Sequence, residues 1–133
     1  MGVSYMGWRI VPYFDIIRII DFKQPGRYNS PMRAFKHPTA DEFVLERVLY
    51  ALSDPVRMEI VRRLARLGEA TCGDLDGGRP KSSVSHHFRV LRDSGLIHTT
   101  NIGTTHINRL RHGEMQSRFP GLLDAILAQR IEM

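Results

Sequence analysis

The feature that most constrains the fold is the stretch over residues 79–97, which has the pattern of one short helix with two different faces. An apolar stripe at helical spacing is formed by Val84, Phe88 and Leu91. The opposite side carries hydroxyl, imidazole and guanidinium groups. Pro80 and Ser82 favour a helix start, and Gly95 favours a left-handed helix end. The pattern therefore predicts a helix over residues 82–94.

The polar face of this predicted helix suits insertion into a DNA major groove. Arginine donates hydrogen bonds to guanine O6 and N7, and serine and histidine reach base edges or phosphates. An ordinary amphipathic surface helix would have the same periodicity, so the helix alone leaves both interpretations open. The DNA interpretation predicts a contact set in which Arg92 and Arg109 clamp phosphates. Its members are Lys81, Ser82, Ser83, Ser85, His86, Arg89, Arg92 and Arg109.

Positive charge is concentrated around the same helix. The chain has 133 residues and a formal net charge of +5. The stretch 79–111 holds six Lys or Arg residues and a single acid, Asp93, so the whole net charge falls within it. A solvated basic face would give the same count, but clustering on one helix and the segment after it favours a nucleic-acid footprint.

Three separated segments resemble the ArsR-type winged-helix repressor family. They are residues 51–61, 84–91 and 94–97, and the resemblance covers roughly residues 41–127 in order and spacing. It implies a mainly α fold with a small β-hairpin, a winged helix-turn-helix of order α-α-α-α-β-β-α. It also implies binding to double-stranded DNA and a homodimer formed through the first and last helices. The family's Ser-x-His pattern places His86 toward the DNA and His87 inward.

Two helices are expected before the helix-turn-helix. Residues 39–42 have the pattern of a capping box, with Thr39 and Glu42 as its partners, and Asp54 with Pro55 begins the second helix, which ends at Gly68. The first carries an apolar stripe at helical spacing, Leu45, Val48, Leu49 and Leu52, and the core face of the second is Ile60, Val61, Leu64 and Leu67. Arg57 has two interpretations, a phosphate contact or a partner of a nearby acid, and is left out of the contact set.

The helix-turn-helix itself is expected to consist of a brief helix at residues 71–75, a turn at 76–80 and the 82–94 helix. Thr71 caps the brief helix and Leu75 points inward. Gly77 and Gly78 predict a looser turn than is usual in the family.

A β-hairpin, the wing, is expected from residues 97–101 and 104–108, joined through Ile102 and Gly103. Family wings commonly carry Arg or Lys near the tip, whereas this tip is neutral, so the wing should add little DNA affinity. His98 and His106 are candidates to face each other across the hairpin.

The last helical region, residues 111–133, is interrupted by Pro120. It carries an apolar stripe of Leu122, Leu123, Ile126 and Leu127. The stripe fits a dimer interface, and packing of a terminal helix on its own core is the alternative.

The chain is expected to divide into an N-terminal extension, residues 1–38, and a winged-helix DNA-binding and dimerisation domain, residues 39–133. The extension holds seven of the eleven aromatic residues, so composition changes near its end. It is either an arm that packs on a partner subunit or reaches DNA, or a segment that precedes a true start at Met32.

Several functions are disfavoured by what the sequence lacks. The single cysteine, Cys72, cannot form a disulfide within the chain, which fits a reducing cytoplasm. No apolar run is long enough for a membrane span. No nucleophile–base set or phosphate loop indicates an enzyme, and no cofactor is expected. The family's thiolate metal sites use paired cysteines, so a metal site is not expected either.

These observations predict a cytoplasmic homodimeric repressor that binds a palindromic operator through the 82–94 helix, with an inducer that the sequence does not identify. Two alternatives remain open. One is a winged-helix protein-interaction module without DNA binding, which the neutral wing tip motivates. The other is a metal- or thiol-responsive sensor.

Overall fold

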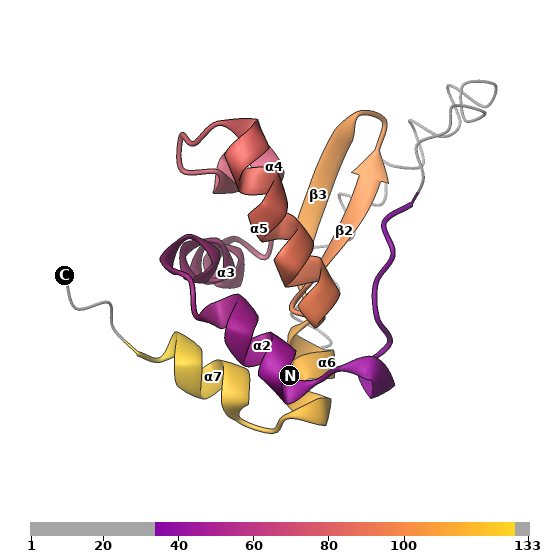
Figure 1. The fold of residues 1–133 in the computed structure, drawn as a ribbon, viewed down its shortest axis with the longest axis vertical. Coiled ribbons are helices and arrows are strands. Elements are labelled where there is room, and N and C mark those ends of the chain that lie inside the picture. The colour runs from indigo at the N-terminus through magenta and orange to yellow at the C-terminus, as the bar shows by residue number, and fades with distance from the viewer. Residues whose placement is uncertain (1–33, 130–133) are drawn as a thin grey trace.

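Helices and strands follow one another along residues 34–129, which are the residues described by the computed structural model (Figure 1). Both predictions for the N-terminal extension, an arm or a start at Met32, concern residues that lie almost wholly outside this range. The mainly helical fold with a small antiparallel sheet is as predicted. In chain order the elements are η1 (Ala40–Glu42), α2 (Leu45–Leu52), α3 (Pro55–Leu67), β1 (Glu69–Thr71), α4 (Cys72–Leu75), α5 (Lys81–Ser94), β2 (Ile97–Ile102), β3 (Thr105–Leu110), α6 (His112–Arg118) and α7 (Leu122–Leu127).

The first helix begins later than the sequence predicts. Residues Ala40–Glu42 form one 3-10 turn, and the Thr39 side chain makes no capping hydrogen bond. The turn closes through the backbone instead, where the Glu42 N–H donates to the Thr39 carbonyl at 2.9 Å. The chain then extends through Phe43, whose ring is buried in the core. The predicted capping box is therefore wrong, because burial of Phe43 requires extended backbone where the helix was expected to continue.

Helix α2 buries one side of its surface and leaves an apolar strip exposed. Val48, Ala51 and Leu52 are buried, whereas Leu45 and Leu49 are 40% and 47% exposed. Leu67, at the end of α3, is also exposed. The prediction that Leu67 belongs to the core face of the second helix is therefore wrong.

Helix α3 begins and ends as predicted. The Asp54 side chain accepts hydrogen bonds from the N–H groups of Val56 at 2.8 Å and Arg57 at 3.1 Å, and Pro55 occupies the first turn. Gly68 ends the helix with a φ of 83°. The buried face of α3 holds Ile60, Val61 and Leu64, which join the helices and the sheet into one core cluster.

The predicted hairpin is present, and a third strand extends it. Strands β2 and β3 pair antiparallel around Gly103, which has a φ of 59°. Strand β1 pairs with the other edge of β3, giving the order β1-β3-β2. The sequence did not predict β1, because a strand of three residues is too short to show a period and its partner is distant in the chain. The register pairs His98 with Arg109 and His106 with Asn101. The two histidines therefore do not face each other, and that prediction is wrong.

The terminal region forms two short helices, α6 and α7, with the predicted break at Pro120 between them. Leu123 is buried, and Leu122, Ile126 and Leu127 pack partly buried against the core. Within residues 34–129, no helix combines the length and apolarity that crossing a membrane requires.

Candidate nucleic-acid interface

The short helix α4 is fixed by reciprocal capping. The Thr71 hydroxyl accepts from the Asp74 N–H at 3.1 Å, and the Asp74 carboxylate accepts from the Thr71 N–H at 3.1 Å. The Thr71 hydroxyl, which also donates to the Asp74 carboxylate at 2.8 Å, and the Thr71 N–H hold the pKa of Asp74 below its usual value. Leu75 is fully buried, so the predicted cap and the predicted inward side chain are both confirmed.

The turn between α4 and α5 is held in place despite its two glycines. Gly77 and Gly78 both take left-handed conformations, with φ of 63° and 79°. The Asp76 carboxylate accepts from the Gly78 N–H at 2.8 Å. Arg79 forms an ion pair with Glu59 of α3 at 3.1 Å, which ties the turn to the body of the domain. Arg79 is thus a structural residue of the turn.

Helix α5 has the two predicted faces. Val84, Phe88 and Leu91 are buried, and Gly95 ends the helix with a φ of 90°. The start differs in detail, because the Ser82 side chain makes no capping hydrogen bond and Pro80 takes the N-cap position. The members of the predicted contact set that lie exposed on this helix are Lys81, Ser82, Ser83, Ser85, His86 and Arg89.

The two predicted phosphate clamps lie in more enclosed surroundings. Arg92 is partly buried, with its guanidinium 4.1 Å from the centre of the Phe35 ring. Arg109 is partly buried on β3, where it pairs across the sheet with Glu69 on one side and His98 on the other. The structure therefore sets these two arginines apart from the six exposed residues of the set.

His87 points inward, as the resemblance implies. It is partly buried, and its Nδ1 lies 3.3 Å from an Arg57 guanidinium nitrogen. Arg57 is only 4% exposed. It donates to the carbonyls of Ala51 at 2.7 Å and Tyr50 at 3.1 Å. Its guanidinium therefore serves the C-terminal end of α2, and its charge also helps lower the pKa of Asp54, after the backbone hydrogen bonds from Arg57 and Val56.

Arg111 is a second buried arginine that the charge pattern did not distinguish. It forms an ion pair with Glu114 at 2.6 Å and donates to the Pro38 carbonyl at 2.7 Å. The pKa of Glu114 is lowered by its hydrogen bond from Arg111. Arg111 and Arg79 are therefore two basic residues of the 79–111 stretch that each form an ion pair with an acid.

The segment before η1 lies along the wing, which the sequence did not reveal. The His37 ring stacks on His98 with centroids 3.9 Å apart, and its Nε2 accepts from the Thr99 N–H at 2.9 Å. Burial and the positive groups nearby lower the pKa of His37 to about 4. Figure 1 shows this segment running beside β2. Residues 34–38 thus pack on the domain even though they belong to the predicted extension.

The described residues do not fit a metal site of the kind the family uses. No three His, Cys, Asp or Glu side chains gather within residues 34–129. His112 and Asp124 form a pair at 2.6 Å that joins α6 to α7. Cys72 lies 3.3 Å from the Asn108 side-chain nitrogen. Neither group supplies the four ligands that zinc prefers.

A capped short helix, a fixed turn, a second helix with an exposed polar face and a two-stranded wing beside it define a winged helix-turn-helix protein. Comparison with known proteins agrees. A helix-turn-helix domain family matches residues 52–100. The HTH-type transcriptional regulator YceK of Bacillus subtilis (strain 168) is 32% identical over 90 residues, which cover 65% of this chain and 90% of that protein.

Among solved structures, the crystal structure of an ArsR family transcriptional regulator is similar to this fold. It has a TM-score of 0.52 and 28% sequence identity, and the match covers 61% of this chain and 90% of that one. The chain belongs to the ArsR-type helix-turn-helix transcriptional regulators. The family predicted from the three sequence segments is therefore confirmed.

Proposed function

We propose that this DNA-binding regulator is a homodimeric repressor that recognises a palindromic operator, with α5 of each subunit in a major groove. The observation that carries the proposal is the exposed face of α5, where donors and acceptors at helical spacing stand opposite a fully packed apolar face. Residues 39–133 would form the DNA-binding and dimerisation domain, and residues 1–38 an extension of it.

Roles within the contact set follow from exposure. His86 and Arg89 are exposed in the middle of α5 and are the candidates for base edges. Lys81, Ser82, Ser83 and Ser85 lie at the N-terminal end, where a helix end and hydroxyls favour phosphates. Arg92 and Arg109 are less accessible and would reach DNA only at the margin of the interface. The set remains Lys81, Ser82, Ser83, Ser85, His86, Arg89, Arg92 and Arg109.

Support for the dimer comes from large apolar side chains that are exposed in the described part of the chain. The exposed large apolar residues are Val44, Leu45, Leu49, Tyr50 and Leu67. Most of them lie on or beside the first long helix, α2, which the family resemblance assigns to the interface. Exposed apolar patches on a folded domain often mark interaction sites.

The deciding experiment is fluorescence anisotropy with DNA from the protein's own promoter and with scrambled DNA, at two salt concentrations. A repressor should bind the promoter about 10³-fold or more tightly than scrambled DNA. Its affinity should fall steeply as salt increases. Equal weak binding to both DNAs, together with co-elution of the chain with a protein partner, would favour the protein-interaction module instead.

Arg89→Ala tests the base-reading role. If Arg89 contacts a base, the variant should lose about 1–3 kcal/mol of operator binding and should discriminate less at one base position. If it contacts only phosphate, the loss should be similar on all sequences and the salt slope should shrink by about one unit. Arg66→Ala, at the exposed end of α3, is the matched control. Equal binding by both variants would remove Arg89 from the contact set.

A further inference from the structure

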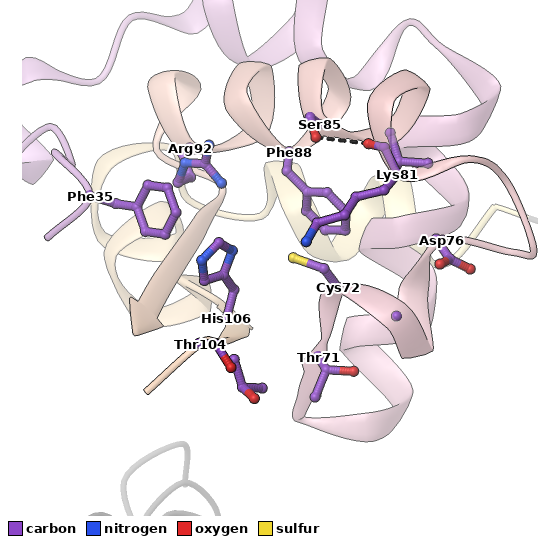
Figure 2. Close-up of a pocket in the computed structure, with 13 residues that line it drawn as sticks. Phe35, Thr71, Cys72, Asp76, Lys81, Ser85, Phe88, Arg92, Thr104 and His106 are labelled. Atoms are coloured by element: carbon purple, nitrogen blue, oxygen red, sulfur yellow. Dashed lines mark hydrogen bonds between the residues drawn. The ribbon is translucent and has the colours of Figure 1, made fainter. Parts of the chain in front are cut away.

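A cavity of about 660 Å³ lies between α5, the start of α4 and the tip of the wing. Figure 2 shows α5 along one side, with the Phe88 ring and the Lys81 side chain directed into the space beneath it. Val84 and Phe88 line it with the small part of their surface that is exposed, 2% and 4%, and the Phe35 ring stands at one end. Polar side chains outnumber apolar ones in the lining, and the volume lies within the range of sites for small organic molecules.

The polar groups at this cavity favour an anion. Lys81 and Arg92 line it from two ends of the same helix, and His106 lines it from β3. Arg92 lies over Phe35, and within residues 34–129 no carboxylate forms an ion pair with it. Burial lowers the pKa of Arg92. Asp93 acts on the Arg92 guanidinium electrostatically but forms no ion pair with it. A guanidinium that is partly withdrawn from water and lacks a direct ion pair is stabilised by a bound carboxylate.

One carboxylate also lines the cavity, and its position does not oppose this preference. Asp76 lies at the end away from Arg92 (Figure 2). Its Oδ1 accepts the hydrogen bond from the Gly78 N–H that holds the turn. The end of the cavity between Phe35, Arg92 and His106 therefore keeps the positive charge of Arg92, while burial lowers the pKa of His106.

We propose that this cavity binds a small organic anion with an aromatic or branched apolar body, its carboxylate on Arg92 and its body beside Phe35 and the small exposed parts of Val84 and Phe88. A DNA phosphate is a poorer occupant, because a phosphodiester has no apolar group to place on this surface. Phe35 also covers the guanidinium on one face. The chemistry of the walls thus points to an amphipathic ligand.

Binding there would oppose DNA binding, a step that rests on the proposed function. Lys81, Ser85 and Arg92 belong both to the cavity lining and to the predicted contact set. The wing forms the facing wall. A ligand that engages these side chains competes with DNA for them, and the site would act as an inducer site.

Cys72 gives a direct measure of occupancy. It lines the cavity, it is partly buried, and it is the only cysteine of the chain. Its rate of alkylation by neutral iodoacetamide, followed by mass spectrometry, therefore reports access to the cavity in the absence of DNA. The probe pair is 2-naphthoate and its neutral counterpart 2-naphthamide. We expect naphthoate to slow alkylation in a saturable way, at about tenfold or more lower concentration than naphthamide, because only the anion pairs with Arg92.

Two variants make the test specific. Arg92→Gln should abolish the difference between the two probes, whereas Arg89→Gln, which removes the same charge from an exposed site outside the cavity, should preserve it. Thr105→Trp places a large side chain at an exposed lining position and should block both probes without changing charge. Thermal melts establish whether each variant is folded. If Arg92→Gln does not fold, Thr105→Trp still tests whether the probes bind in the cavity.

Several outcomes would overturn the proposal. Equal protection by the anion and the amide would remove the anion preference. Protection by inorganic phosphate as strong as that by naphthoate would make the cavity a phosphate site. No protection at millimolar naphthoate would exclude the site. Promoter anisotropy with and without naphthoate separates the two proposals. Specific DNA binding that naphthoate leaves unchanged would overturn only the inducer step. Protection of Cys72 without specific DNA binding would overturn the repressor function and leave the anion site.

Discussion

Arg57 is the single residue whose role departs furthest from its chemical type. Its guanidinium is buried and donates to the carbonyls of Ala51 and Tyr50, at the end of α2. The last carbonyls of a helix have no partners within it. Arg57 supplies them from the first turn of the next helix, and so fixes the angle between α2 and α3.

Arg57→Met should therefore destabilise the domain. The substitution keeps the apolar stem but leaves the Ala51 carbonyl buried without this donor, so we expect the free energy of unfolding to fall by about 1–3 kcal/mol. Urea denaturation measures the change. Arg66→Met, on the exposed end of the same helix, should change stability by no more than about 0.5 kcal/mol. Similar losses in the two variants would contradict the capping role of Arg57.

His37 should make stability depend on pH below neutrality. Its pKa falls from 6.5 to about 4 in the folded protein. Between these values the unfolded chain binds the proton and the folded chain does not, so stability is fully present above pH 6.5 and is lost as pH falls toward 4. Protonation also removes the acceptor for the Thr99 N–H. Burial lowers the pKa of His98 and of His106, which act in the same direction.

His37→Gln tests this contribution, since glutamine accepts a hydrogen bond without titrating in this window. The melting temperature of the variant should fall less than that of the wild type as pH is lowered through the same interval. Lys36→Gln, an exposed neighbour, is the control and should follow the wild type. If the melting temperature of His37→Gln falls with pH as much as that of the wild type, His37 is not the source of this pH dependence.

At the scale of elements, the exposed strip of α2 should carry the subunit contact. Leu49→Glu places a charge among uncovered apolar side chains, and desolvating that charge in an interface is costly. If the wild type has the mass of two chains, as proposed, we expect the variant to have the mass of one chain in size-exclusion chromatography with light scattering at the same concentration. Its helical circular dichroism should be unchanged, because Leu49 is not part of the core.

Arg47→Glu is the matched control for this prediction. It lies on the same helix, it is exposed and it introduces the same side chain. It should remain dimeric. If Leu49→Glu and the wild type have the same mass in solution, α2 is not the interface.

The elements also differ in how far the sequence predicts them. Helix α5 and the wing were predictable because their signals are local: an apolar period, a glycine at each required left-handed position, and a β-branched run on either side of Gly103. Strand β1 was not, because its partner β3 is distant in the chain. Leu45 and Leu49 lie at helical spacing with the buried residues of α2. Spacing identifies an apolar face but does not indicate whether that face is buried within the domain. The placement of Phe35 and His37 depends on stacking partners that no spacing rule connects.

At the scale of the whole molecule, the net charge is larger than the number of positive side chains in the 79–111 stretch that are free to contact DNA. Arg79 and Arg111 are paired with Glu59 and Glu114. Arg92 and Arg109 are partly buried. Lys81 and Arg89 remain as the exposed cations of the 79–111 stretch. With so few free charges, one subunit should hold a half-site weakly, and strong binding should require both subunits on the same DNA.

Half-site spacing should consequently control affinity. Two α5 helices of a dimer reach successive major grooves on one face of the duplex, about 34 Å apart. Inserting about 5 base pairs between the half-sites turns the second one to the opposite face, and affinity should fall by about 10²-fold or more, to that of a single half-site. Replacing the same number of spacer base pairs without inserting any should leave affinity nearly unchanged. Full affinity for the lengthened operator, measured by the same anisotropy titration, would mean that the subunits bind independently and that the dimer does not set the register of the two helices.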